Sequence, residues 1–173
     1  MKTMLLAIGN AGGNILETIR RESKHTALKD ARYVFADCDV SDLSKHDSDG
    51  CSSILLNFEN MPFPTDIFEN VEKLVIVSGL GGKTATKFTE LAAMAAKDVG
   101  VGSVNVVSTI PFIFEGDNRV RLATSAAQRL AEIGGVNVSI FNNEDLLAKF
   151  PNLDFFNAFE AVDREIMQII EKY

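Results

Sequence analysis

Two glycine-rich segments constrain this sequence most, because each follows a short apolar run and precedes a stretch of helical periodicity. The first covers residues 9–14 (GNAGGN) and the second residues 78–86 (SGLGGKTAT). Glycine lets a backbone approach a phosphate closely, and a helix start offers free N–H groups and a partial positive charge. Each segment predicts a strand-to-helix turn that can hold an anion. For either segment alone, a tight turn without a ligand stays an open alternative.

Short apolar runs alternate with helical stripes along the whole chain. We expect strands at residues 3–8, 32–36, 53–57, 73–78, 103–109 and 136–141, and apolar helix faces at 88–99, 120–131 and 155–170. This alternation is typical of parallel strands joined by helical crossovers. The sequence therefore predicts one α/β domain over residues 1–173, a three-layer Rossmann-like parallel sheet with helices on both faces. Ligands of such sheets lie beyond the carboxyl ends of the strands, where the two glycine segments should meet.

Composition and charge exclude several classes of protein. The 46% of hydrophobic and 24% of charged residues are typical of a globular protein. A net charge of −7 disfavours nucleic-acid binding, which needs a basic surface. Two cysteines cannot form a dense disulfide network, so we expect a cytoplasmic protein. No apolar stretch reaches the roughly 18 to 20 residues that span a bilayer, so we expect no membrane partner.

Histidine and cysteine spacing gives no sign of a metal site or a nucleophile. His25 and His46 lie far apart in polar surroundings and lack a second ligand one helical turn away, so we expect both to be exposed. Cys38 follows the second expected strand and is interpreted as a small buried hydrophobic residue. The polar segment 37–50 is expected to be a loop with at most one helical turn.

Five ordered motifs resemble the tubulin/FtsZ-like GTPase family. The first glycine segment resembles the family's opening loop, and residues 79–86 (GLGGKTAT) are similar to its GGGTGTG signature. Residues 109–119 (TIPFIFEGDNR) then resemble PFxFEGxxR, residues 141–147 (FNNEDLL) resemble IPNDxLL, and residues 157–163 (NAFEAVD) resemble DAFxxAD. The resemblance covers nearly the whole chain and implies the nucleotide-binding domain of that family.

The resemblance also implies a site for GTP or GDP. The family would hold the phosphates on the two glycine loops, the ribose on Glu115 with Arg119 nearby, and guanine between Asn143 and Asp163 with Phe159 stacked on it. A carboxylate can accept both hydrogen bonds of the guanine N1 and N2 edge. The implied nucleotide-binding residues are Gly9, Asn10, Gly12, Gly13, Asn14, Gly79, Gly81, Gly82, Lys83, Thr84, Thr86, Glu115, Arg119, Asn143, Phe159 and Asp163.

Two of these assignments have structural alternatives. Phe159 continues the apolar stripe of the last expected helix, so core packing alone would also explain it. Glu115 and Arg119, four residues apart, would also suit a surface helix pair.

The sequence departs from the family pattern at the second glycine loop. Lys83, Ala85 and Lys87 stand where the resemblance predicts glycine. If any of these positions needs a positive φ, the side chain costs roughly 1 kcal/mol. The ammonium of Lys83 would either bind the phosphates or fill their space. Asp37 stands where the family has asparagine, and a carboxylate there repels phosphate unless Mg²⁺ lies between them. The family's glycine-rich third loop is replaced by residues 57–63 (NFENMPF).

The sequence as given stops where the resemblance would begin a long central helix. The family's second domain and its acidic catalytic loop are then missing, so we expect at most weak GTPase activity and no self-stimulated hydrolysis. A guanine-nucleotide-binding protein of this kind would cap or regulate a filament of a full-length FtsZ/tubulin-like relative in cell division or the cytoskeleton, or self-associate. The role in capping or regulating a filament is a hypothesis.

Two other functions stay open. One is an interaction domain that kept the fold while its nucleotide site decayed. The other is a P-loop ATPase, because residues 82–84 (GKT) match part of GxxxxGK[ST]. That motif requires glycine at position 77, which is Val77.

Overall fold

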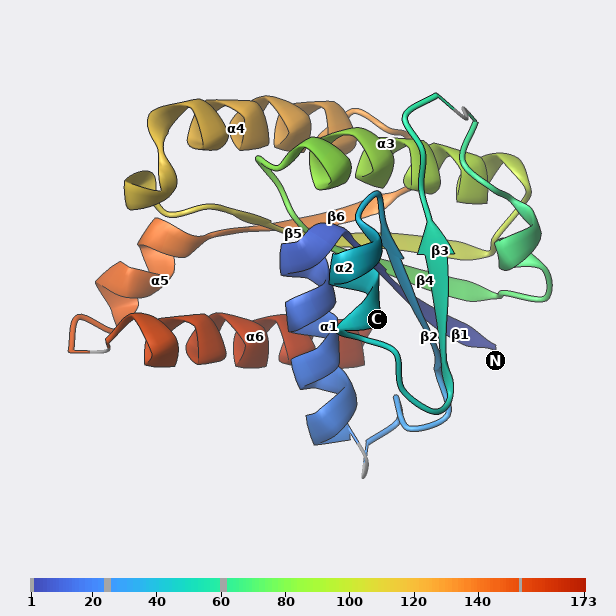
Figure 1. Ribbon diagram of the computed structural model, residues 1–173, viewed down its shortest axis with the longest axis horizontal. Helices are drawn as coiled ribbons and strands as arrows, with labels where there is room; N and C mark the ends of the chain where they lie inside the picture. The colour runs from blue at the N-terminus through green and yellow to red at the C-terminus, as the bar shows by residue number, and fades with distance from the viewer. Residues whose placement is uncertain (1, 24–25, 60–61, 153) are drawn as a thin grey trace.

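The sheet has six parallel strands in the order β3-β2-β1-β4-β5-β6 (Figure 1). This computed structural model describes residues 2–23, 26–59, 62–152 and 154–173. The strands are β1 (Thr3–Ile8), β2 (Arg32–Asp37), β3 (Cys51–Leu55), β4 (Lys73–Gly79), β5 (Ser103–Ile110) and β6 (Asn137–Asn142). The predicted three-layer α/β architecture is confirmed. Five of the strands lie within a residue of their predicted bounds, and β3 lies two residues earlier than predicted.

Helices cover both faces of the sheet. Figure 1 shows α3 (Lys83–Asp98) and α4 (Asp117–Ala131) on one face, and α1 (Gly9–Glu22) and α6 (Phe155–Lys172) on the other. The short helices α2 (Val40–Ser44) and α5 (Asn143–Lys149) contribute Leu43 and Leu146 to the core on the α1 side. Among the described residues, no helix is long and apolar enough to cross a membrane.

Alternate residues of the central strands supply the two cores. In β1, Met4, Leu6 and Ile8 pack with α3 and α4, whereas Leu5 and Ala7 pack with α1 and α6. Successive strand side chains point to opposite faces, so a strand covered on both sides is apolar at every position. This is why β1 is a continuous apolar run in the sequence.

The predicted helix stripes mark the buried faces, with differences near their ends. Val162, Ile166 and Ile170 of α6 are almost completely buried at four-residue spacing. Val99 was placed in the α3 stripe, but it caps the end of that helix and is 50% exposed. Phe159 was placed in the α6 stripe, but it is 45% exposed.

The segment between β2 and β3 is more ordered than predicted. It contains the five-residue helix α2, whose N-terminus is capped by Asp39 accepting from the Ser41 N–H at 2.7 Å. The prediction that His46 is exposed is wrong, because it is 6% exposed and stacks on Phe35 with ring centroids 4.6 Å apart. His25 lies outside the described residues.

The order of the strands creates a crevice between β1 and β4. From β1 the chain proceeds to β2 on one side, and from β4 it proceeds to β5 on the other. The crossover helices α1 and α3 therefore lie on opposite faces, with both N-termini at the same edge of the sheet. A ligand-binding crevice is expected at such a switch point.

Candidate functional site

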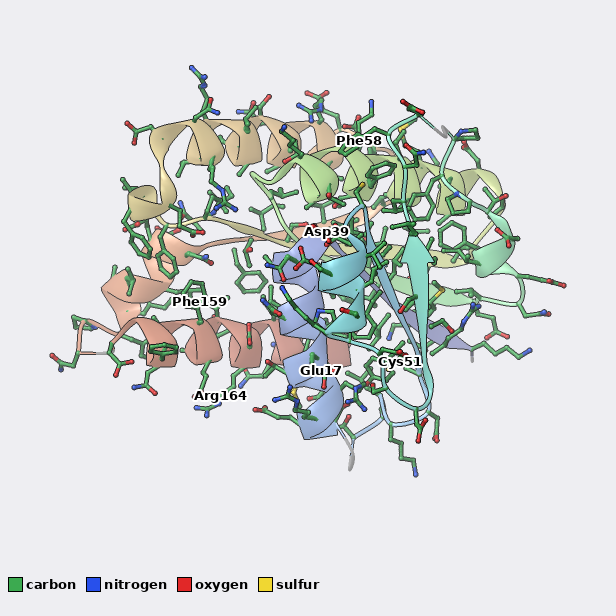
Figure 2. All side chains as sticks on the ribbon, in the orientation of Figure 1. Glu17, Asp39, Cys51, Phe58, Phe159 and Arg164 are labelled. Atoms are coloured by element: carbon green, nitrogen blue, oxygen red, sulfur yellow. The ribbon has the colours of Figure 1, made fainter. Side chains whose placement is uncertain are left out.

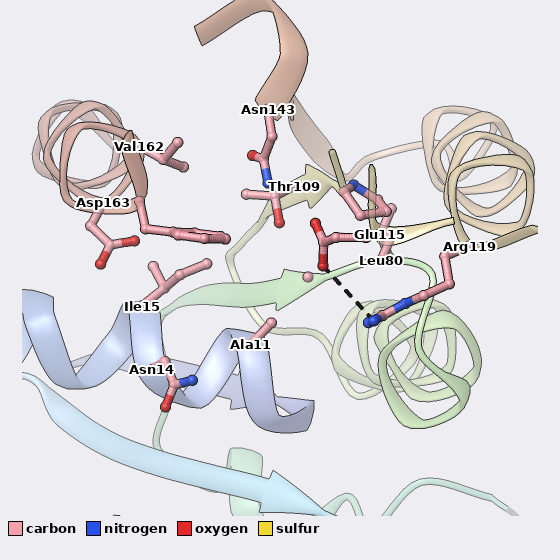
Figure 3. Close-up of a pocket in the computed structure, with 13 residues that line it drawn as sticks. Ala11, Asn14, Ile15, Leu80, Thr109, Glu115, Arg119, Asn143, Val162 and Asp163 are labelled. Carbon is pink, nitrogen blue, oxygen red and sulfur yellow. Dashed lines mark ion pairs between the residues drawn. The ribbon is translucent and has the colours of Figure 1, made fainter. Parts of the chain in front are cut away.

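Two adjoining cavities lie at this edge, beyond the carboxyl ends of the strands. The first, here called the apolar cavity, has a volume of about 290 Å³ and lies between α1, α5 and α6 (Figure 3). The second, the loop cavity, has a volume of about 340 Å³ and lies between the two glycine loops. Ala11, Asn14, Gly79, Glu115 and Arg119 line both. Together they form one elongated site with an apolar end and a polar end.

Most of the predicted nucleotide-binding residues line this site. Those in the apolar cavity include Asn143, Phe159 and Asp163, and those in the loop cavity include Gly9, Asn10, Gly82, Lys83 and Thr84. Asn14, Gly79, Glu115 and Arg119 line both cavities. Gly12, Gly13, Gly81 and Thr86 line neither. The structure thus brings together residues far apart in the sequence: Asn14 of α1 and Asp163 of α6, 149 positions apart, both line the apolar cavity.

Gly12 and Gly13 face the protein interior. A Cβ on Gly12 would lie 2.5 Å from the carbonyl oxygen of Val77 in β4, so only glycine fits there without a shift. A Cβ on Gly13 would lie 2.5 Å from Nε2 of His46. These two glycines let α1 pack closely on the sheet and on the buried histidine.

The altered positions of the second loop are compatible with its geometry. Lys83, Ala85 and Lys87 all lie within α3, and among the described non-glycine residues only Asn70 has a positive φ. The strain that a positive φ would have imposed is therefore absent. The residue that needs glycine here is Gly81, with φ +101° and the Arg119 carbonyl oxygen 2.7 Å from where its Cβ would be.

The threonine hydroxyls of the second loop are both hydrogen-bonded within the protein. Thr84 donates to Oδ1 of Asp37 at 3.3 Å, and Thr86 accepts from the Gly81 N–H at 3.0 Å. Oδ1 of Asp37 also accepts from the Cys38 N–H at 2.6 Å. Cys38 is half-buried rather than fully buried as predicted, and burial raises the pKa of its thiol.

Glu115 organises the loop that separates the two cavities. Its Oε2 accepts from the Phe112 N–H at 2.8 Å, and its Oε1 lies 3.8 Å from Nη1 of Arg119 (Figure 3). Glu115 ends the 3-10 helix η3 (Ile113–Glu115), while Arg119 lies in α4. The pair therefore joins two elements at the rim of the site, where the Arg119 side chain is 51% exposed.

Asn143 lines the apolar cavity and carries a buried, unpaired acceptor. It is the first residue of α5, is 5% exposed, and its Oδ1 is buried with no hydrogen-bond partner among the described residues. Figure 3 shows its side chain extending from α5 toward the cavity. Buried polar atoms in folded proteins are nearly always hydrogen-bonded, so this oxygen suits a ligand donor or a water molecule.

Asp163 and Phe159 approach the same cavity from α6. Burial raises the pKa of Asp163 to about 6, against the opposing effect of a hydrogen bond from Thr18. Phe159 lies edge-on to Phe112, with ring centroids 5.2 Å apart, and Figure 2 shows it on the opposite side of α6 from Arg164. The cavity therefore combines an aromatic ring, an amide and a titratable carboxyl group.

The polar end of the site fits phosphate better than a protein-bound metal ion. The described residues include no group of three or more histidine, cysteine, aspartate or glutamate side chains placed to hold a metal. A divalent ion near Asp37 would therefore need phosphate oxygens among its ligands, as is common for Mg²⁺. The start of α3, a 16-residue helix without an acidic first turn, favours an anion.

Several residues of the apolar cavity carried no signal in the sequence. Ile15, Leu80, Pro111 and Val162 line it, and each is equally suited to an ordinary core. Ala11 lies inside the first glycine segment and Thr109 begins the motif at residues 109–119. The sequence positions of these two residues could therefore have placed them in the predicted site.

Comparison with known proteins gives the same family that the sequence motifs suggested. The chain matches no protein-family model. It is 32% identical over 106 residues to cell division protein FtsZ 1 of Pyrococcus abyssi, covering 61% of this chain and 28% of that protein. It is 26% identical over 185 residues to cell division protein FtsZ of Haloferax mediterranei, covering 96% of this chain and 48% of that protein. The chain thus spans at most about half the length of these curated relatives.

Solved structures share the fold over almost the entire chain. An empty FtsZ dimer of M. jannaschii aligns with a TM-score of 0.78 at 23% identity, over 98% of this chain and 53% of that one. The GDP-bound monomer of CetZ1 from Haloferax volcanii aligns with a TM-score of 0.74 at 18% identity, over 97% of this chain and 58% of that one. Together with the FtsZ sequence matches, this shared fold supports a divergent tubulin/FtsZ-like family member, of which the chain covers the N-terminal domain.

Proposed function

We propose that this chain binds a guanine nucleotide, with the base in the apolar cavity and the phosphates in the loop cavity. The observation that carries the proposal is the buried, unpaired Oδ1 of Asn143, a residue that lines the apolar cavity together with Phe159 and Asp163. An amide can meet the polar edge of a purine, an aromatic ring can support its face, and a carboxylate can accept from guanine N1 and N2.

The loop cavity supports the phosphate half of the proposal. Gly9, Gly82 and the start of α3 line it, so backbone N–H groups and the positive end of a helix lie beside it. The related CetZ1 structure contains GDP, which supports the same ligand class for this fold.

Nucleotide titration tests the proposal directly. We expect isothermal titration of the purified chain to give micromolar dissociation constants for GTP and GDP. ATP should bind at least about 100-fold more weakly, because adenine has no hydrogen-bond donor at N1 or C2 to meet the carboxyl of Asp163. ITP, which lacks the guanine amino group, should bind with intermediate affinity.

The same titration separates the competing functions. No binding of GTP or GDP at millimolar concentration would favour an interaction domain with a decayed site. Preference for ATP over GTP would favour the P-loop ATPase alternative. Either result contradicts the proposal.

We also propose that this domain acts with a filament-forming relative of the FtsZ type, in cell division or the cytoskeleton. One related structure is an FtsZ dimer, and here Ile113 and Phe114 are 59% and 58% exposed on the loop beside the site. Sedimentation of a full-length FtsZ polymer with this chain tests the proposal. We expect the polymer mass to change with the ratio of the two proteins, and an unchanged mass at every ratio would contradict it.

A further inference from the structure

We propose that Lys83 makes this site prefer nucleotides with more phosphates, and that Asp37, which lines the same cavity, has the opposite effect. This inference rests on the proposed nucleotide function and goes beyond it, because it assigns opposite effects on affinity to two named side chains. It follows from which charges of the loop cavity are already paired within the protein.

Five charged residues line the loop cavity: Asp37, Asp42, Lys83, Glu115 and Arg119. Glu115 and Arg119 form an ion pair with one another, and Asp42 pairs with Lys45 outside the cavity. Neither Asp37 nor Lys83 takes part in an ion pair within the described part of the chain. These two side chains therefore provide the unbalanced charges that a bound phosphate would meet.

Asp37 is held rigidly at the cavity wall. It ends β2 and is 6% exposed, and its Oδ1 accepts from the Cys38 N–H, the Asp39 N–H and the Thr84 hydroxyl. These hydrogen bonds prevent the carboxyl group from turning away from the ligand. Where no Mg²⁺ lies between them, a fixed carboxylate beside a phosphate weakens binding by like-charge repulsion.

Lys83 also lines the loop cavity, at the positive end of a long helix. It is the first residue of α3, directly after the N-cap Gly82, and its side chain is exposed. The flexible lysine side chain can follow the terminal phosphate, and its attraction increases with the charge of the phosphate chain. Lys83 therefore adds more to triphosphate binding than to monophosphate binding.

Lys87 provides a matched control for Lys83. It is also an exposed lysine of α3 and lies four residues later, on the same side of the helix, but it does not line the loop cavity. Removing either ammonium changes the net charge of the protein by the same amount. Only the change at Lys83 should alter how affinity depends on phosphate number.

The test is a set of dissociation constants for GMP, GDP and GTP at low and high salt, measured without Mg²⁺. The variants are Lys83→Gln, Lys87→Gln, Asp37→Asn and the double variant Asp37→Asn/Lys83→Gln. Asparagine keeps an oxygen that can accept the bonds to Oδ1. Melting temperatures within a few degrees of the unmodified chain show that each variant is folded.

We expect Lys83→Gln to weaken GTP binding about tenfold, GDP binding about threefold and GMP binding less than about twofold. High salt should reduce these differences. Asp37→Asn should strengthen GTP binding about fivefold, and the double variant should bind within about threefold of the unmodified chain. Lys87→Gln should leave all three constants unchanged.

Three results overturn the inference while leaving nucleotide binding intact. The first is an equal loss of GMP, GDP and GTP affinity in Lys83→Gln, and the second is an effect of Lys87→Gln equal to that of Lys83→Gln. The third is Asp37→Asn binding GTP no better than the unmodified chain. A wild-type chain that binds none of the three nucleotides overturns the proposed function as well.

Discussion

Both glycine loops of this protein line the loop cavity, but they differ in which of their residues do so. The loop after β1 keeps its glycines, but Gly12 and Gly13 pack against β4 and His46 and do not line the site. The loop after β4 carries Lys83 and Ala85 in place of glycine, and both of these residues line the loop cavity. The number of glycines in a loop therefore does not show how much of it faces a ligand.

Backbone conformation explains the difference between the loops. Lys83, Ala85 and Lys87 occupy helical positions, where a side chain costs nothing in backbone strain. The glycines that the turns require, Gly9 with φ +78° and Gly81 with φ +101°, are both retained. Side chains have replaced glycine only where the backbone tolerates them.

The largest effect is expected from Gly12→Ala. A Cβ there would overlap the Val77 carbonyl oxygen, which belongs to a central strand and cannot easily move. We expect the free energy of unfolding to fall by about 3 kcal/mol, measured by urea denaturation. Gly134→Ala is the control, since no atom lies within 4 Å of its Cβ position. Equal stability of the two variants would show that Gly12 is not confined by packing.

Asp163→Asn should have the next largest effect, on ligand affinity. We expect GTP binding to weaken about 30-fold, or about 2 kcal/mol, because asparagine cannot accept both guanine hydrogen bonds. The exposed carboxyl of Glu160 on the same helix supplies the control, Glu160→Gln. A 30-fold loss of GTP affinity in both variants would show that Asp163 has no specific role in binding.

The same carboxyl group predicts how GTP affinity depends on pH. With a pKa of about 6, Asp163 is ionised above pH 6 and protonated below it. Affinity should therefore be constant from pH 7 to 8 and fall as the pH decreases through about 6. Asp163→Asn should lack this dependence, and a wild-type profile that is flat down to pH 5 would contradict the assignment.

Gly13→Ala tests the packing of the first loop on His46. The new Cβ would lie 2.5 Å from a buried ring that stacks on Phe35, so we expect a loss of about 1.5 kcal/mol in unfolding free energy. In a His46→Ala background the ring is absent, and the same change should cost less than about 0.5 kcal/mol. Identical costs in the two backgrounds would show that the two residues do not compete for space.

His46 should also make stability depend on pH. Burial lowers its pKa in the folded state, so the unfolded chain binds a proton more readily. Stability is then lost as the pH falls below the unfolded value of about 6.5. Asp163, with its raised pKa, has the opposite effect, since its contribution is lost as the pH rises through about 6. Comparing Asp163→Asn with Asp163→Asn/His46→Leu isolates the histidine, and equal pH profiles would contradict its role.

The smallest effect is expected where glycine is put back into the second loop. Ala85→Gly and Lys87→Gly should each lower the free energy of unfolding by about 0.5 to 1 kcal/mol, because glycine is a poor helix former. At a position with a left-handed backbone, the same change to glycine would instead raise the free energy of unfolding. A stabilising effect of either change in chemical denaturation would therefore contradict the helical assignment.

The sequence predicted most of the fold because its central strands are apolar on both faces. β1 and β4 are continuous apolar runs, and the glycine segments that follow them mark the turns. The third strand was misplaced by two residues because β3 is an edge strand with an irregular apolar pattern, in which Ser52, Ser53 and Leu55 are exposed.

The site was predicted less completely, for reasons of packing. Motifs identified the polar residues, but they could not show that Gly12 contacts Val77 or that His46 lies beneath Gly13, since these are contacts between distant segments. His46 lies in a polar segment, DLSKHDSD, whose composition predicts exposure. Its burial depends on the space that Gly13 leaves free.

The central claim is that the second loop meets the phosphates while α5 and α6 meet the base. ¹⁵N-resolved NMR titrations of the full chain with GMP and with GTP test it most directly. We predict that the Asn143 side-chain amide shifts with both ligands, whereas the backbone amides of Lys83 and Thr84 shift strongly with GTP alone. Shifts of Lys83 and Thr84 that are the same for GMP and GTP, or no shift of Asn143 at saturation, would contradict the account.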